Sequence, residues 1–160
     1  MSTVDKNKAV IKFLSDCPVI KDNPLFFNFA EANDEHNQYV TQANDVTLNK
    51  TFVDGSKQKE FTFTLLTFKS ISNNAIIKED SILNENIEDL QELQAIIDWV
   101  NDQSDSHNYP DFGEGFLIDD MRTTTDTPQY DGVNVGVSPA LAMYSIVIRI
   151  IYIDYTKTLY

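Results

Sequence analysis

The sequence predicts an α+β fold, a single domain in which a mostly antiparallel or mixed β-sheet carries two main helices packed on one face. Two segments repeat apolar residues at helical spacing, and segments rich in aromatic and β-branched residues lie between and after them. The chain shows no internal repeat and no flexible linker. Helices segregated from runs of strands are typical of α+β domains, and 160 residues are enough for one such domain.

Two helices are expected. The first covers about residues 4–16 and ends before Pro18, because the residue preceding a proline is pushed out of the α region. The second covers about residues 87–102, with Asn86 as its N-cap and acidic residues in its first turn. The apolar positions at helical spacing are Ala9, Val10, Phe13, Leu14 and Cys17 in the first helix and Ile87, Leu90, Leu93, Ile96, Ile97 and Val100 in the second.

Strands are expected where β-branched and aromatic residues gather without helical period. Asp54 and Gly55 form a turn, because Asp-Gly readily supplies the positive φ angles of a tight hairpin. In the strand after this turn, Leu65 and Leu66 are adjacent, which predicts that its middle is covered on both sides. The expected strands are residues 25–32, 36–52 (irregular), 57–72, 116–126, 128–137 (a strand or a hairpin containing glycines) and a long, apolar one at 141–155.

Composition and charge exclude several classes of partner. With 12 basic and 25 acidic residues the net charge is −13, which opposes tight binding to nucleic acid or to an anionic membrane. The most apolar segment, residues 140–155, contains Arg149 and Asp154 and is too short for a membrane anchor. A single cysteine excludes an internal disulfide, and no secretory signal is seen, so we expect folding in a cytoplasm.

The residues that most often carry chemistry form no recognisable constellation. His36 and His107 are far apart in sequence and are expected at the surface, and Cys17 lies on the apolar side of the first helix. The acidic pairs lack the spacing of a calcium loop or a zinc helix, and we expect them on solvated faces and caps. They are Glu79-Asp80, Glu88-Asp89 and Asp119-Asp120. We therefore expect no catalytic residue, no cofactor and no metal.

The stretch from Asn108 to Gly115, NYPDFGEG, is the most distinctive in the chain. It lacks the Gly-x-Gly-x-x-Gly spacing and the Lys-Ser or Lys-Thr of phosphate-binding loops. Gly113 and Gly115 are better explained by positive φ angles, with Pro110 stiffening the approach. We expect Asp111 and Glu114 at the surface, where they are candidates for a subunit or partner contact. Three residues of the closing strand are further interface candidates: Tyr144, Arg149 and Tyr152.

Several segments, in this order, resemble the tail terminator family of phages that infect Gram-positive bacteria, whose members are also labelled tail completion or minor capsid proteins. They are a short helix ending in SDCPVI, then FVDGSKQKEFTFTLLTFKS, LQELQAIIDWVNDQ, YPDFGEGFLIDDMRTTT and AMYSIVIRIIYID. The Asp-Gly-Ser turn and the Pro-x-x-Gly-Glu-Gly segment are the most specific parts. The segments 84–86 and 125–139 depart from the family pattern, which affects partner contacts more than the fold.

The resemblance implies that residues 1–160 form one tail-terminator-like domain of a structural virion protein. Six copies would form a ring that caps the tail tube, ends tube polymerisation and offers a docking surface to the head connector, and also to the sheath in a contractile tail. The ring would assemble in the bacterial cytoplasm, and the genome would pass through its lumen without tight binding. Such capping depends on shape, since a closed ring caps a tube of matching symmetry.

Two alternatives stay open on the sequence. One is another neck component, a head-completion protein or connector adaptor, which would bind the portal side and not the tube. The other is a small hydrolase or nucleotide-binding enzyme that uses Glu114 or the Asp119-Asp120 pair. A tube-elongation assay separates the first alternative, and loss of turnover in Glu114→Gln or Asp119→Asn would support the second.

Overall fold

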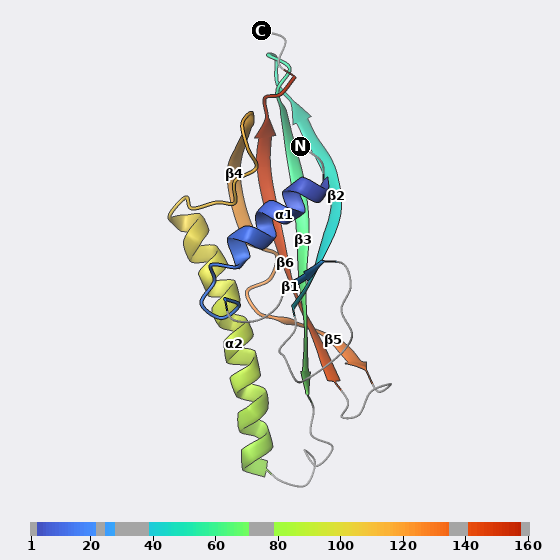
Figure 1. Ribbon diagram of the computed structural model, residues 1–160, viewed down its shortest axis with the longest axis vertical. Helices are drawn as coiled ribbons and strands as arrows, with labels where there is room; N and C mark the ends of the chain where they lie inside the picture. The colour runs from blue at the N-terminus through green and yellow to red at the C-terminus, as the bar shows by residue number, and fades with distance from the viewer. Residues whose placement is uncertain (1–2, 22–24, 28–38, 71–78, 135–140, 158–160) are drawn as a thin grey trace.

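The computed structural model describes residues 3–21, 25–27, 39–70, 79–134 and 141–157 (Figure 1). Within these residues the chain is an α+β domain, as predicted. No described helix contains a stretch long and apolar enough to cross a bilayer. In chain order the elements are α1 (Thr3–Leu14), β1 (Leu25–Phe27), β2 (Tyr39–Thr51), β3 (Lys57–Ser70), α2 (Glu79–Asp105), β4 (Phe116–Thr123), β5 (Gln129–Asn134) and β6 (Leu141–Asp154).

The strands form one mixed sheet of six strands in the order β1-β2-β3-β6-β4, with β5 also paired to β6. Only the short β1–β2 pairing is parallel among the described pairs, and the rest are antiparallel. Strand β6 pairs with β3 along its whole length on one side. On its other side it pairs with β5 near its start and with β4 near its end. The long β3–β6 pair is therefore the spine of the molecule.

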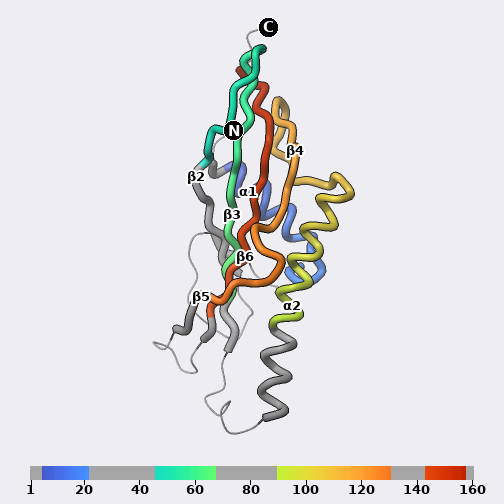
Figure 2. Tube along the Cα trace, turned by 180° about the vertical axis from the view of Figure 1, so that it is seen from behind, coloured from blue at the N-terminus to red at the C-terminus, as the bar shows by residue number. Residues whose placement is uncertain are grey.

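The core lies between one face of this sheet and both helices. Because side chains alternate across a strand, β3 and β6 each send every second residue to this face. Figures 1 and 2 show α1 in front of the strands in one view and behind them in the other. The core residues on the sheet include Phe61, Phe63, Leu65, Met121, Ile146, Ile148, Ile150 and Tyr152, and those on the helices include Val10, Phe13, Leu14, Leu93, Ile96, Ile97 and Val100.

Helix α1 forms close to where its apolar spacing predicts. It has Asp5 in its first turn and Lys12 in its last, both favourable to the helix dipole. The helix ends at Leu14, two residues earlier than expected, and the chain continues in turns past Pro18. Amide hydrogens of Ile20 and Lys21 donate to the carbonyl oxygen of Cys17 at 3.0 and 2.8 Å. These turns bury Cys17 and Ile20 beneath the end of the helix.

Helix α2 is longer than the sequence predicted. It begins at Glu79, so Asn86 lies inside the helix and is not its N-cap. An asparagine in a helix interior lowers the stability of the helix only slightly. A residue type that favours N-caps can therefore also occur where no helix begins. Of the predicted apolar stripe, Leu93, Ile96, Ile97 and Val100 are buried and Leu90 is 39% exposed. The side chain of Ile87 lies outside the described residues.

The strand boundaries follow the sequence closely where they are described. The irregularity expected in β2 appears as two register shifts, between Ala43 and Val46 and between Leu48 and Lys50. Residues 28–32, 36–38, 71–72 and 135–137 were also expected in strands and lie outside the described residues. The turn between β2 and β3 forms as expected, with φ 89° at Gly55. Asp54 Oδ1 accepts hydrogen bonds from the Ser56 amide at 2.9 Å and from its hydroxyl at 2.6 Å.

Candidate functional site

The stretch 106–115 connects α2 to β4 and is built as a defined turn. The amide of Asn108 donates to the carbonyl of Gln103 at 2.8 Å, and that of His107 donates to Ser104 at 3.0 Å. This pair of bonds is the Schellman arrangement that ends many helices. Its left-handed position, where glycine is most common, is occupied by His107 with φ 55°. The Asn108 side chain also donates to the Gln103 side chain.

Phe112 anchors the middle of this stretch in the core. It is 3% exposed, and its ring meets those of Phe61 and Tyr152 edge-on, with centroids 6.1 and 5.4 Å away. Beside it, the Gly113 amide donates to Asp111 Oδ1 at 2.8 Å. One carboxylate is thus used to close the turn, a role typical of Asp in loops.

Gly113 and Gly115 adopt φ angles of 92° and 86°. These lie in the region that residues with a Cβ rarely occupy. The carbonyl oxygen of Gly115 accepts a hydrogen bond from the Tyr155 amide at 2.8 Å. The stretch is therefore fixed at both ends, to α2 at its start and to the end of β6 at its finish.

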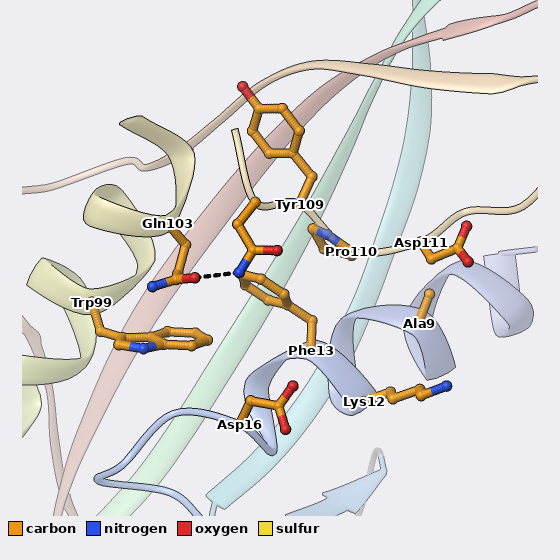
Figure 3. Close-up of a pocket in the computed structure, with 10 residues that line it drawn as sticks. Ala9, Lys12, Phe13, Asp16, Trp99, Gln103, Tyr109, Pro110 and Asp111 are labelled. Atoms are coloured by element: carbon orange, nitrogen blue, oxygen red, sulfur yellow. Dashed lines mark hydrogen bonds between the residues drawn. The ribbon is translucent and has the colours of Figure 1, made fainter. Parts of the chain in front are cut away.

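Two open hollows lie on either side of this stretch. The first, about 430 Å³, is bounded by α1, α2 and residues 108–111. Figure 3 shows that Phe13 and Trp99 point toward one another in it, with ring centroids 5.0 Å apart, whereas Tyr109 points away from them. The second hollow, about 550 Å³, is lined by residues 107–112 and the first residues of β4. The stretch thus forms a wall between two concave surfaces.

The titratable side chains that line the first hollow are Lys12, Asp16, Tyr109 and Asp111, and those that line the second are His107, Tyr109 and Asp111. Among the residues that the structure describes, no three His, Cys, Asp or Glu side chains gather to hold a metal ion. His107 is exposed and its Nδ1 lies 3.2 Å from the Tyr109 hydroxyl. Cys17 is fully buried, and burial raises the pKa of its thiol, which makes it a weak nucleophile. His36 and the side chains of Glu79, Asp80, Glu88 and Asp89 lie outside the described residues.

The sheet face opposite the helices forms a second candidate surface, here called the open face. It is made by alternate residues of β3, β6 and β4, and the described parts of the chain place no helix over it. The expectation that Leu66 is covered like Leu65 is wrong, because Leu65 is buried under the helices and Leu66 faces the open side, where it is half-buried. Apolar residues on the open face are Leu66, Leu117, Val147, Ile151 and Ile153.

The two arginines of the open face form ion pairs, Arg149 with the neighbouring strand and Arg122 with its own strand and with α2. Arg149 Nε lies 2.7 Å from Glu60 Oε1 on the neighbouring strand. Arg122 lies 2.5 Å from Asp105 at the end of α2 and 3.7 Å from Asp120. Hydrogen bonding to Glu60 and Asp105 raises the pKa values of Arg149 and Arg122 respectively. The open face is therefore an apolar strip crossed by exposed ion pairs.

The residues singled out in the sequence fall in different places. Asp111, Glu114 and Arg149 are exposed, the first two on the connecting stretch and the third on the open face. Tyr144 is half-buried and packs against Tyr130 with centroids 5.8 Å apart. Tyr152 is removed from the interface candidates, because even-numbered residues of β6 face the helices and its side chain is fully buried.

Sequence reasoning missed the exposed apolar members of the open face. Leu117 is 55% exposed, and Ile151 and Ile153 are half-buried. The signal that could have found them is the alternation of side chains along β6. Residues 151 and 153 lie on the same face of the strand as Arg149, which the sequence had already indicated as a surface residue. Asp119 and Asp120 stand at a register shift in β4, where Asp120 pairs with Arg122 and not with Asp119.

No protein-family model matches the chain, and no curated protein sequence is significantly similar to it.

Proposed function

We propose that this chain is a structural protein of a phage virion, which forms a ring on the end of the tail tube. The open face of the sheet carries the proposal. Strands β4 and β6 expose a strip of Leu117, Ile151 and Ile153 that no described element covers. A sheet face of this kind is stabilised when a second protein surface removes it from water. The resemblance to tail terminators, carried by several segments that occur in the family's order, is the reason for proposing a tail-tube ring as the assembly.

In this proposal the chain acts by shape and not by catalysis. Each copy places its open face or a sheet edge against a different surface of the next copy, so that the contacts close into a ring of six. The ring covers the last layer of tube subunits and stops their addition. Its other side meets the connector of the head, and also the top of the sheath if the tail is contractile.

The connecting stretch is the proposed contact with a partner protein. Asp111 and Glu114 are exposed, while Phe112 fixes the backbone between them. A surface turn held in this way loses little conformational entropy on binding. The tube protein or the connector is the proposed occupant of this surface.

A direct test is the assembly state of the purified protein and of an open-face variant. We expect light scattering and negative-stain images to show rings, and Ile151→Glu to give monomers with a native circular dichroism spectrum. Ser15→Glu is the matched control, because Ser15 is exposed at the end of α1, on the side of the sheet away from the open face. Rings from Ile151→Glu would exclude this face as the subunit contact, and a wild-type chain that stays monomeric at every concentration would exclude the ring.

Adding the protein to assembling tail tube subunits separates the proposal from its alternatives. A terminator halts elongation at substoichiometric amounts, whereas a connector adaptor leaves tube length unchanged. The hydrolase alternative requires turnover that Glu114→Gln or Asp119→Asn removes. Both side chains are exposed, and no described His, Cys or acidic cluster accompanies them.

A further inference from the structure

Lysine side chains gather at the end of the sheet where the β2–β3 turn meets the end of β6. They line a cavity of about 240 Å³, here called the lysine pocket. Four of the 12 basic residues of a chain with net charge −13 lie there. The lining residues are Lys6, Gly55, Lys57, Lys59, Phe116, Asp154, Thr156 and Lys157.

The fold brings these lysines together from separate elements. Lys57 and Lys59 are alternate residues of β3, and both point to the helix-covered side of the sheet, since Lys59 pairs with Tyr152 and Lys57 with Asp154 on β6. Lys6 comes from the first half of α1, and Lys157 from the turn after β6. The spacing of these lysines in the sequence does not predict the pocket.

One carboxylate organises the pocket without neutralising it. Asp154 Oδ2 lies 3.0 Å from Lys59 Nζ. Its Oδ1 accepts hydrogen bonds from the amide and hydroxyl of Thr156 at 2.9 and 2.5 Å. Asp5 is the other carboxylate that acts on Lys6. Against these two acids stand four lysines, so the pocket keeps a positive charge.

Lys6 makes the pocket more than a group of surface lysines. It is only 5% exposed, and its Nζ lies 5.4 and 5.3 Å from the ring centroids of Phe116 and Tyr152. Burial lowers the pKa of Lys6, and repulsion from Lys59 lowers it further. Burying an ammonium group beside other ammonium groups is unfavourable in free energy, because the group loses water and the like charges repel one another. An anion bound among them would offset this repulsion.

Helix α2 carries the opposite charge. Its sequence holds nine Asp and Glu residues and no Lys or Arg. Asp98 and Asp102 are exposed on it, four residues apart on one side. Figure 1 shows α2 starting at the end of the molecule opposite to the β2–β3 turn. Asp98 and Asp102 lie in the last third of α2, and a head-to-tail contact between copies can bring them to the lysine pocket of the next copy.

We propose that the lysine pocket binds an oxyanion, and that in the assembled ring this oxyanion is a carboxylate on α2 of the neighbouring copy. The first part stands on the pocket alone, and the second rests on the ring of the proposed function. Such a contact supplies charge complementarity between copies that otherwise repel through their net charge. It also fixes which surface of one copy meets which surface of the next.

The first experiment measures anion binding by calorimetry with inorganic phosphate, in chloride buffer, on protein kept monomeric by dilution. The double variant Lys57→Gln/Lys157→Gln leaves the buried Lys6 in place, and Lys8→Gln/Lys12→Gln removes the same charge from exposed positions of α1. We expect the pocket variant to bind phosphate about tenfold more weakly or worse, from the loss of charged hydrogen bonds. The control should bind like wild type. Equal binding by all three proteins, or none by wild type, would overturn the oxyanion site.

The second experiment identifies the source of the carboxylate. One variant carries Lys57→Glu and Lys157→Glu, and the other carries Asp98→Lys and Asp102→Lys. Each alone should fail to form rings, while an equal mixture should restore them, because copies that alternate around a six-membered ring bring every reversed pocket to a reversed helix. Rings from either variant alone, or no rings from the mixture, would overturn the contact with α2. A monomeric wild type would reject the ring and this second part, while the phosphate result still decides the site.

Discussion

Individual residues fix the turns of this molecule through backbone geometry. Gly113 and Gly115 have similar φ angles, 92° and 86°, but their surroundings differ. A Cβ on Gly113 would meet nothing within 4 Å, whereas one on Gly115 would lie 2.9 Å from Thr156 Cγ2. The first position needs glycine for its conformation, and the second needs it also for space.

Alanine at these two positions should therefore destabilise unequally. We expect Gly113→Ala to lower the free energy of unfolding by about 1 kcal/mol, from positive-φ strain. Gly115→Ala should cost about 1 kcal/mol more, because Thr156 must move and its bonds to Asp154 are disturbed. Urea denaturation of both variants measures the difference. Equal losses would mean that Thr156 rotates away freely.

Asp154 is the residue that makes stability depend on pH. Burial would raise the pKa of its carboxyl group, but hydrogen bonds from Thr156 and the Lys59 ammonium outweigh burial and lower it to about 2, from an ordinary 3.8. Because the folded pKa is the lower one, Asp154 stabilises the fold above pH 3.8. That stabilisation is lost as the pH falls through about 2.

Asp154→Asn should consequently be less stable than wild type by about 2 kcal/mol at pH 7. The difference in unfolding free energy should shrink between pH 4 and pH 2, because the wild-type carboxylate is then protonated as well. Denaturation at a series of pH values gives the measurement. A gap that remains constant down to pH 2 would show that the charge of Asp154 contributes nothing.

At the scale of elements, the helices are stable because the sheet covers their apolar sides. Few helices are stable in water by propensity alone, and α2 has no basic residue in its last turn to favour its dipole. Its attachment depends on Leu93, Ile96, Ile97 and Val100, all buried. Asn101 adds hydrogen bonds to Thr123 of β4, at 3.1 Å to the hydroxyl and 3.2 Å from the amide.

Truncation along α2 should report its orientation on the sheet. Ile96 is fully buried and Leu90 is 39% exposed. We expect Ile96→Ala to lower the free energy of unfolding by about 3 kcal/mol, from lost burial and a cavity. Leu90→Ala should lower it by less than about 1 kcal/mol. Thermal and urea unfolding measure both values, and similar losses would contradict the described face of α2.

At the scale of the whole molecule, the net charge opposes binding to polyanions such as DNA. The chain has a net charge of −13, and the lysine pocket of its described residues is a cavity of about 240 Å³ and not an extended basic track. If six copies form the proposed ring and part of this acidic surface lines its lumen, the lumen repels DNA. A duplex would then slide through without being held.

We therefore expect no binding of the ring to duplex DNA at physiological salt. Fluorescence anisotropy with a labelled duplex tests this, with the Lys57→Gln/Lys157→Gln variant included as a control for the lysine pocket. Micromolar or tighter binding that weakens steeply with salt would mean that the lumen is basic, and it would contradict this account of passage.

The sequence by itself determined the α+β class, the order of the elements, the turn at Asp54 and Gly55 and the glycines of the connecting stretch. These features depend on residues close together in the sequence, because a few neighbouring residues determine the apolar period, the turn type and the need for a positive φ angle. Local signals gave a wrong helix start where one residue type suits two positions. Asn86 serves as well inside a helix as at its start, and α2 begins at Glu79.

Only the tertiary structure decided which side of each strand faces the helices, and so which residues can meet a partner. Leu65 and Leu66 are equally apolar, yet one is buried and the other faces the open side, and Tyr152 is buried although Arg149 on the same strand is exposed. The lysine pocket joins residues from α1, β3 and the end of β6. Sequence fixes the period of a strand, but its phase and its distant neighbours depend on packing of the whole chain.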